Sequence, residues 1–332
     1  MTLLFSHFPR LPRGILAALL PVALAVAAPQ AKAEFPEQPL TLVVPFSPGG
    51  GTDNTARALG EGMSANLGKP IIVENRAGAG SIIGTNYVAH SKPDGYTMLL
   101  ATFAHAVNPA LYPNLPYDTD KAFEPVAMIA HSPNVLVVSP KLPFHSVQDL
   151  LAYAKAHPGT LNYGSTGIGT SAHLAGELLK NLAGINMKHV PYKGAAPALT
   201  DLISGQIQVM LITAASATSY VKSGQVRALA VTSAQRSPAF PDLPTLAEAG
   251  VPGYQAESWS GIFVPAGTPE PVVRRLRDAV AAAVKTAAFQ RQVTTEGLMV
   301  DVGEPKQLSD YVSAEEARWR RVVHDAHIQA LN

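Results

Sequence analysis

Hydrophobic residues along the chain form short β-branched runs that alternate with longer stretches of helical spacing. The first run covers residues 40–44, and apolar side chains within residues 56–67 then recur every three or four positions, as on one face of a helix. Short runs at 71–73 and 97–100 continue the alternation. Strand–helix–strand order at this spacing predicts an α/β fold in which helices cover a mainly parallel sheet.

The same order restarts in the middle of the chain. Three more strand-like runs follow, at residues 135–138, 161–163 and 227–231. Helical spacing marks four further segments, at about residues 146–156, 174–182, 269–287 and 308–331. Two α/β units of this kind predict two lobes with a ligand cleft between them. We expect lobe 1 to comprise residues 34–132 and 261–332, and lobe 2 to comprise residues 133–260.

The amino terminus has the pattern of a secretory signal. Arg10 and Arg13 precede an uncharged apolar run, residues 14–28, and two small residues, Ala31 and Ala33, follow it. The run is shorter than the roughly 20 apolar residues that a membrane-spanning helix needs, which argues against an uncleaved anchor. We therefore expect export, with cleavage of the signal peptide after Ala33.

Composition excludes several classes of function. Without residues 1–33, which hold three basic residues and no acidic one, the chain has 22 basic and 24 acidic residues, a formal charge of −2. Such a balance gives no electrostatic reason to bind nucleic acid or anionic lipid. The sequence has no cysteine, so it has no disulfide framework, thiol nucleophile or thiolate metal site.

Two glycine-rich turns are the strongest candidates for a binding site. Residues 47–51 and 164–169 each follow an expected strand and precede an expected helix, and they belong to different lobes. Open parallel sheets bind ligands at the carboxyl ends of their strands. A helix amino terminus adds free N–H groups and a positive dipole end, which favour an anion. The pattern predicts a carboxylate held across the cleft without lysine or arginine.

The candidate ligand-binding residues come from these two turns and from one later strand. They are Phe46, Ser47, Gly49, Gly50, Thr52, Asp53, Ser165, Gly167, Thr170, Ser171 and Ile212. The glycines permit close approach of the backbone to a ligand, or they only serve the turns. The hydroxyls bind the ligand or cap the second helix. Asp53, or its neighbour Asn54, is expected to cap the first helix; because its carboxylate would repel an acid, we expect it to fix the loop.

Ile212 bears on which acid is bound. If Ile212 lines the cleft, no side chain there pairs with a ligand ammonium group, whose desolvation would cost about 1–3 kcal/mol or more. The ligand would then be a carboxylate without an amino group, such as an aromatic or medium-chain acid. The alternative is that Ile212 is the last core residue of a β-branched strand.

Signatures of catalysis and of cofactor binding are missing. No G-x-S-x-G motif surrounds Ser47, Ser165 or Ser260, so there is no nucleophile elbow. The glycines from Gly78 to Gly84 have the spacing GxGxxxG, which departs from a dinucleotide-binding turn, and no H-E-x-x-H motif occurs. We predict no catalytic residue, no cofactor and no metal; an exported hydrolase acting on a small ester or amide is the alternative function.

The same segments carry a family resemblance. They are residues 43–53 (VVPFSPGGGTD), 75–80 (NRAGAG), 163–174 (YGSTGIGTSAHL), 189–194 (HVPYKG) and 259–261 (WSG). In this order they resemble the tripartite tricarboxylate transporter receptors, also called Bug-type periplasmic receptors. The resemblance extends over essentially the whole chain after the signal peptide.

The resemblance implies a receptor and not an enzyme. Members of this family have a two-lobe, Venus-flytrap fold and pass a small carboxylate to a membrane permease. The carboxylate is held largely by main-chain groups and ordered water from the two loops. The resemblance thus implies a periplasmic solute-binding protein, and we expect it to be a monomer.

Overall fold

Two groups of strands form the sheet of the computed structural model, which describes residues 35–192 and 194–328. The expected signal peptide, residues 1–33, lies outside the described residues. The first group consists of β1 (Leu40–Val44), β2 (Ile71–Asn75), β3 (Thr97–Thr102), β9 (Glu257–Pro265), β10 (Met299–Val300) and the first part of β4 (Phe123–Val138). The second group consists of β5 (Leu161–Ser165), β6 (Met187–Pro191), β7 (Val209–Thr213), β8 (Arg227–Val231) and the last part of β4.

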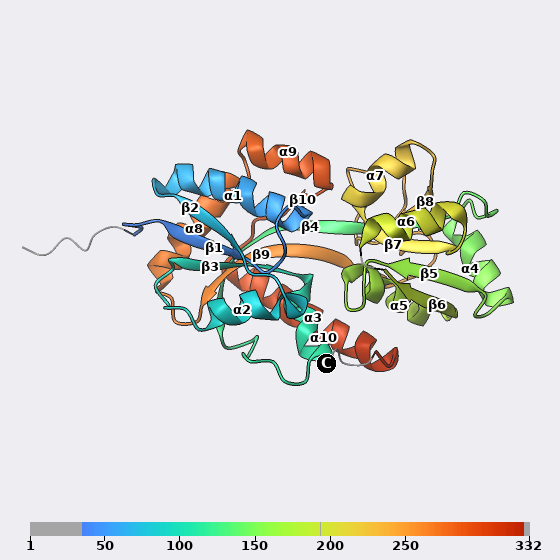
Figure 1. Cartoon of the computed structure of the whole chain (residues 1–332), viewed down its shortest axis with the longest axis horizontal. Coiled ribbons are helices and arrows are strands. Elements are labelled where there is room, and N and C mark those ends of the chain that lie inside the picture. The colour runs from blue at the N-terminus through green and yellow to red at the C-terminus, as the bar shows by residue number, and fades with distance from the viewer. Residues whose placement is uncertain (1–34, 193, 329–332) are drawn as a thin grey trace, which may run out of the picture. The chain divides into compact units, whose positions relative to one another are not determined.

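Strand β4 connects the two groups (Figure 1). Its pairing with β9 ends at Pro133 and Glu257, and from Asn134 onward it pairs with β7 and β8 instead. The sequence indicated only the last four residues of this strand, because Pro125 and Pro133 interrupt its apolar pattern.

Strand directions place the candidate loops opposite each other. β1 and β3 run parallel, β9 is antiparallel to β3, and β4 is antiparallel to β9, so β4 points the same way as β1 and β3. In the second group β7 is antiparallel to β4, and β5 is parallel to β7. The carboxyl ends of β1 and β3 therefore face the carboxyl ends of β5 and β7 across the crossing.

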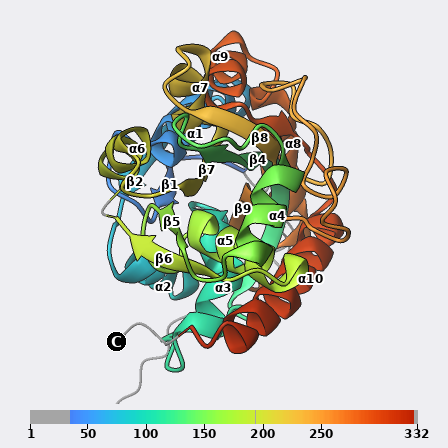
Figure 2. The same cartoon turned by 90° about the vertical axis from the view of Figure 1, so that its right-hand side faces the viewer.

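Helices cover both faces of each group (Figures 1 and 2). On the first group, one face is covered by α1 (Gly51–Leu67), α8 (Glu270–Ala283) and α9 (Ala287–Glu296). The other face carries α2 (Ile82–Ala89), α3 (Phe103–Leu111) and α10 (Pro305–Asp325), with the short turn η1 (Ala79–Ser81) before α2. On the second group, α4 (Val147–Ala156) and α5 (Ser171–Ala183) cover one face, and α6 (Ala195–Ser204) and α7 (Ala214–Lys222) the other.

Successive side chains along a strand point to opposite faces of the sheet, which explains why helices cover both faces. In β1, Leu42 and Val44 join the apolar cluster beneath α1 and α8, whereas Val43 joins the cluster beneath α3 and α10. In β4, Val135 packs toward α6, and its neighbour Leu136 packs on the opposite face. The inner strands such as β1, β4 and β7 are buried on both faces, as expected for a sheet between two helix layers, whereas the edge strand β2 is partly exposed.

Helix boundaries differ from the expected ones at two places. Helix α1 begins at Gly51 with Gly50 as its N-cap, so Asp53 lies in the first turn and does not cap the helix. The segment expected as one helix over 269–287 ends at Ala283, and a second helix begins after Thr286. The Thr286 hydroxyl accepts a hydrogen bond from the Phe289 N–H at 3.3 Å, which starts the new helix.

Gly176 on α5 offers a test of the packing in the second group. A Cβ at this position would lie 2.3 Å from Cε2 of Tyr163, a fully buried ring whose hydroxyl is bonded to Glu177. We expect Gly176→Ala to lower the free energy of unfolding by about 1–3 kcal/mol, measured by urea denaturation. The reason is that the buried Tyr163 ring has no free space into which it could move away from the added methyl group. Leu182→Ala, an exposed position on the same helix, is the control and should cost roughly 0.5 kcal/mol or less. Equal midpoints for both variants would contradict this packing.

Candidate functional site

Two adjoining cavities lie where the carboxyl ends of the strands meet. The first, which we call the loop cavity, has a volume of about 350 Å³ and lies between the loop after β1 and the loop after β5. Phe46 and Thr52 line it from the first loop, and Thr166, Ile168, Gly169, Thr170 and Ser171 line it from the second. Apolar and aromatic side chains of α3 and its end, including Phe103, Leu111 and Tyr112, complete the wall.

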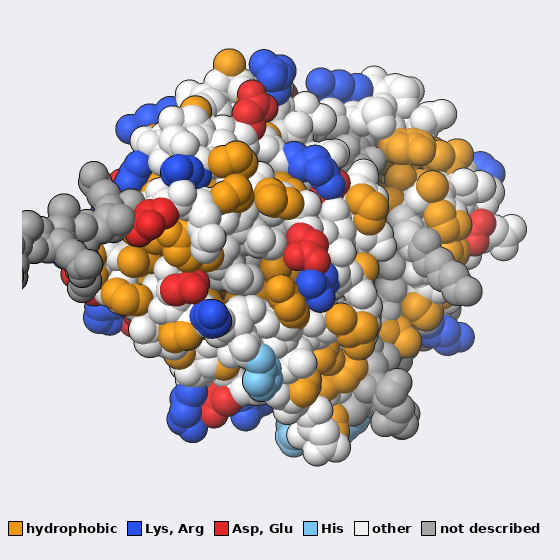
Figure 3. All heavy atoms as spheres, turned by 60° about the vertical axis from the view of Figure 1, so that its left-hand side comes forward, with side chains coloured by type: hydrophobic (Ala, Val, Ile, Leu, Met, Phe, Trp, Pro, Cys, Tyr) orange, Lys and Arg blue, Asp and Glu red, His pale blue; other side chains and the backbone are white. Residues whose placement is uncertain are grey.

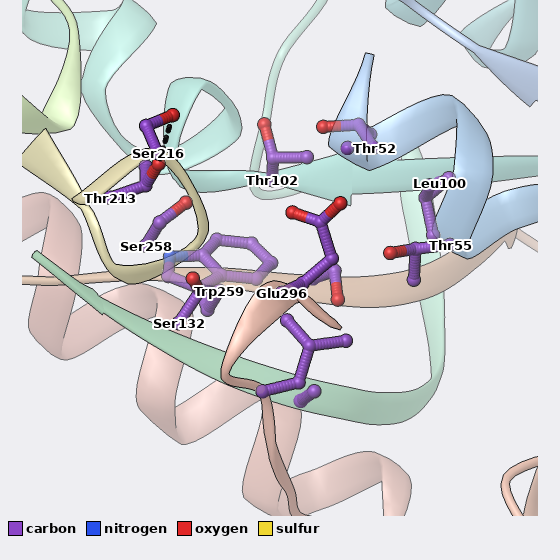
Figure 4. A pocket seen from close by; sticks show the side chains of 14 residues that line it. Thr52, Thr55, Leu100, Thr102, Ser132, Thr213, Ser216, Ser258, Trp259 and Glu296 are labelled. Atoms are coloured by element: carbon purple, nitrogen blue, oxygen red, sulfur yellow. Dashed lines mark hydrogen bonds between the residues drawn. The ribbon is translucent and has the colours of Figure 1, made fainter. Parts of the chain in front are cut away.

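The second, the hydroxyl cavity, has a volume of about 220 Å³ and is drawn in Figure 4. Hydroxyl groups dominate its lining: Thr52, Thr55, Thr102, Ser132, Thr213, Ser216, Ser258 and Ser260. The Thr213 hydroxyl donates to Ser216 Oγ at 3.1 Å. In Figure 4, Trp259 and Glu296 lie between this pair and the threonines Thr52 and Thr55 on the opposite side of the cavity. Thr52, Thr102 and Ser258 line both cavities, so the two adjoin at these residues.

The first loop is held by the buried carboxylate of Asp53. Its Oδ2 accepts hydrogen bonds from the Gly49 N–H and from Arg57 Nε, both at 2.9 Å. Its Oδ1 accepts one from Asn75 Nδ2 at 2.9 Å, and the same amide donates to the Phe46 carbonyl at 3.1 Å. Burial opposes ionisation, but the hydrogen bonds from Arg57, Gly49 and Asn75 hold the pKa of Asp53 below its ordinary value. These hydrogen bonds agree with the expectation that Asp53 fixes this loop.

The second loop is held by two stacked histidines. Ser165 Oγ lies 2.7 Å from His189 Nε2, and it also accepts the Gly167 N–H at 3.2 Å. The Gly169 N–H donates to Nδ1 of His173 at 3.1 Å, and the His173 ring stacks on His189 with 4.0 Å between the ring centroids. Burial lowers the pKa of His173 and of His189 to about 4, so both rings are neutral near pH 7.

The free N–H groups of the site lie at two helix starts. Among the described residues, the N–H groups of Gly51, Thr52 and Asp53 in α1 donate no hydrogen bond, and neither do those of Ser171 and Ala172 in α5. No lysine or arginine that the structure describes lines either cavity. A bound anion would therefore meet uncharged backbone N–H donors and helix dipoles at this site.

The structure brings only some of the expected site residues to the cavity walls. Phe46, Thr52, Thr170 and Ser171 line the loop cavity. The others from the two turns line neither cavity: Ser47, Gly49, Gly50, Asp53, Ser165 and Gly167. The N–H groups of Gly49 and Gly167 are already used inside their own loops, by Asp53 and Ser165 respectively. These residues shape the loops.

Ile212 corrects an expectation about the ligand. The side chain is fully buried in the apolar cluster with Val135, Met210 and Ala214, and it lines neither cavity. It is a core residue of β7, and the next residue, Thr213, reaches the hydroxyl cavity. The sequence argument for a ligand without an amino group therefore loses its basis.

Several lining residues were missed by the sequence analysis. They lie at or near the end of a strand or helix, or in β4 close to the change of its pairing partners: Thr102, Ser132, Thr213, Ser258 and Glu296. A hydroxyl at the carboxyl end of a buried strand was the available signal for Thr102 and Thr213. Glu296 had no such signal, because the sequence analysis predicted no element between residues 287 and 308.

The Ser165–His189 pair has the distance that a nucleophile and its base require, but not the exposure. Ser165 is fully buried, and its hydroxyl donates to the Gly167 carbonyl at 3.1 Å. A buried hydroxyl of this kind does not reach a bound ester or amide. Within the described residues no group of three or more His, Cys, Asp or Glu side chains is arranged to hold a metal ion.

The fold and the site together define a solute-binding protein of the two-lobe periplasmic class. A family model described as tripartite tricarboxylate transporter family receptor matches residues 55–328. The chain belongs to this family. Its members are binding proteins, so the protein is a receptor and not an enzyme.

Three solved structures are similar to this chain. The periplasmic binding protein BugD is 36% identical with a TM-score of 0.74, over 89% of this chain and 99% of BugD. A protein of R. palustris with adipate is 38% identical with a TM-score of 0.77, over 90% of this chain and 100% of that one. MatC from Rhodopseudomonas palustris with bound malate is 36% identical with a TM-score of 0.73, over 87% and 100% of the two chains.

The surface agrees with the balanced composition. On the face shown in Figure 3, acidic and basic side chains are scattered among polar and apolar ones and form no large patch of one sign. Across the described part of the chain, the helices are too short or too polar for any of them to cross a membrane.

The two buried histidines predict a loss of stability in mild acid. Their folded pKa of about 4 lies below the unfolded value near 6.5, so the unfolded chain binds protons first as the pH falls. The stability they contribute is complete above pH 6.5 and is lost toward pH 4. Between pH 7 and pH 5 we expect each histidine to lower the free energy of unfolding by roughly 1–2 kcal/mol, measured by urea denaturation.

A matched pair of variants isolates this effect. His189→Asn should make stability less dependent on pH over this interval, whereas His324→Asn, at an exposed position on α10, should leave the dependence as it is. A pH dependence that is the same in wild type and His189→Asn would contradict the assignment.

Proposed function

We propose that this protein is exported to the periplasm, where it captures a small carboxylate and delivers it to the membrane permease of a tripartite tricarboxylate transporter. Cleavage after Ala33 would release it as a monomer. The ligand carboxylate lies in the loop cavity, between the free N–H groups at the start of α1 and those at the start of α5. The observation that carries the proposal is that two helix starts converge on one cavity that no described lysine or arginine lines.

Known ligands of relatives support a small acid. The similar R. palustris protein is solved with adipate, and MatC with malate, and both are carboxylates of modest size. A cavity of about 350 Å³ is within the range of small-molecule sites. Neutral donors hold an anion without a strong ion pair, which suits a receptor that must also release its ligand to a permease.

We also propose where the boundaries of the two lobes lie. Lobe 1 comprises residues 34–132 and 261–332, and lobe 2 residues 133–260. In support, the pairing of β4 changes from β9 to β7 and β8 at Asn134, and β9 begins its pairing with β4 at Glu257. The two strand segments near these residues form the crossing about which the lobes turn.

Native mass spectrometry of freshly purified protein is the first experiment, because a closed receptor retains its ligand during purification. A mass increase that disappears on denaturation identifies the acid. A thermal-shift assay with malate, adipate, hexanoate and aspartate then shows which kind of acid raises the melting temperature most.

Ser171 offers a substitution that removes one donor and keeps the helix. It is the first residue of α5, where proline is tolerated, and Thr170 before it is already extended at φ −72° and ψ 160°. Ser171→Pro deletes the N–H, so we expect the affinity for the carboxylate to fall about tenfold or more in calorimetry. Ser171→Ala retains the N–H and is the control, with a smaller loss. If Ser171→Pro binds like wild type, this N–H group is not part of the site.

Closure of the lobes is the second test. Because the carboxylate requires donors from both lobes, binding should bring them together about the crossing. Small-angle scattering should give a smaller radius of gyration at saturating ligand than without ligand. The same radius in both states would count against closure around this site.

A further inference from the structure

The hydroxyl cavity contains one carboxyl group whose position is fixed by the fold. Glu296 is the last residue of α9, and Gly297 follows it in the left-handed conformation at φ 63°. A Cβ on Gly297 would lie 3.1 Å from the Cβ atoms of Ala214 and Ala239, so the chain is packed tightly at this point. In Figure 4 the carboxyl group of Glu296 points toward the space beside Thr52 and Thr102.

The amino end of α1 lies directly against this carboxyl group. A Cβ on Gly51 would lie 2.7 Å from Glu296 Oε2, so only a glycine leaves room for it. Glu296 thus stands beside Thr52, a residue that lines both cavities. A ligand that starts in the loop cavity and extends past Thr52 meets this carboxyl group.

No charged side chain among the described residues pairs with Glu296, whose carboxyl group lies beside the start of α1 and so faces the positive end of that helix dipole. Glu296 forms no hydrogen bond or ion pair with the residues that the structure describes, and it is the one charged side chain among those described in the lining of the two cavities. Burial alone raises its pKa. A partly buried carboxyl group without a partner favours a ligand group that supplies a positive charge or hydrogen-bond donors.

The surrounding hydroxyls fit the same kind of group. An ammonium group has three donors and no acceptor, and hydroxyl oxygens accept hydrogen bonds as well as donate them. Glu296 and the oxygens of neighbours such as Thr52 and Thr102 would satisfy all three donors. A second carboxylate in this place would lie close to the partly buried carboxyl group of Glu296, and two like charges at short distance repel each other.

We propose that the hydroxyl cavity binds a cationic amine at the far end of the ligand, and that Glu296 selects such an amino acid over a diacid. This proposal rests on the proposed function, because it takes the first carboxylate to lie in the loop cavity. It separates this chain in specificity from relatives solved with adipate or malate. Selection here works by repulsion of the wrong ligand as much as by attraction of the right one.

Three six-carbon acids test the proposal: ε-aminocaproate, hexanoate and adipate. They share one carboxylate and differ at the far end, which carries an amine, a methyl group or a second carboxylate. In calorimetry at pH 7 we expect ε-aminocaproate to bind tightest, hexanoate less tightly and adipate weakest, with about tenfold or more between the first and the last.

A matched pair of variants assigns the preference to Glu296. Glu296→Gln should weaken ε-aminocaproate and strengthen adipate, so that the difference between them falls below about threefold. Glu61→Gln removes the same charge from an exposed site on α1 and should leave the order unchanged. Thermal melts without ligand establish that both variants are folded.

The outcomes separate this proposal from the proposed function. If adipate and hexanoate bind to wild type but ε-aminocaproate does not, the proposed carboxylate receptor stands and the role of Glu296 is overturned. The same holds if Glu296→Gln leaves the preference for the amine intact. If none of the three acids binds, both proposals fail together.

Discussion

The continuity of β4 through both groups of strands is the constraint on which the site depends. Because one strand belongs to both, the direction of every other strand is fixed relative to it. The carboxyl ends of β1 and β3 are thereby turned toward those of β5 and β7, and the loops that follow them meet in one place. Helix starts, which attract anions wherever they are exposed, become a binding site only through this arrangement.

Rigid polar networks keep the two loops in position. Asp53 secures the first loop through Gly49 and Asn75, and the pair of His173 and His189 secures the second through Gly169 and Ser165. The side chains of Asp53, His173 and His189 line neither cavity, so each acts by positioning other groups. A backbone N–H group is placed only by the conformation of its loop, and these networks fix that conformation.

The sequence allowed prediction of the parts that depend on local patterns. The strand of residues 40–44, the turns at 47–51 and 164–169 and the loop-fixing role of Asp53 follow from apolar periodicity, glycine and charge. The first half of β4 did not, because its prolines interrupt the apolar run and only pairing with β9 makes it a strand. Ile212 could not be assigned, since one residue of strand register decides which side chain enters a cleft, and Glu296 could not because it reaches the cavity only through the packing of α9 against the start of α1.

Helix α10 limits how the two lobes can separate. It belongs to the first group of strands, yet it contacts α5 of the second, and residues such as Trp319 and Leu178 join one apolar cluster. A motion that retains this contact keeps α10 against α5, so any widening between the lobes is confined to the side away from these two helices.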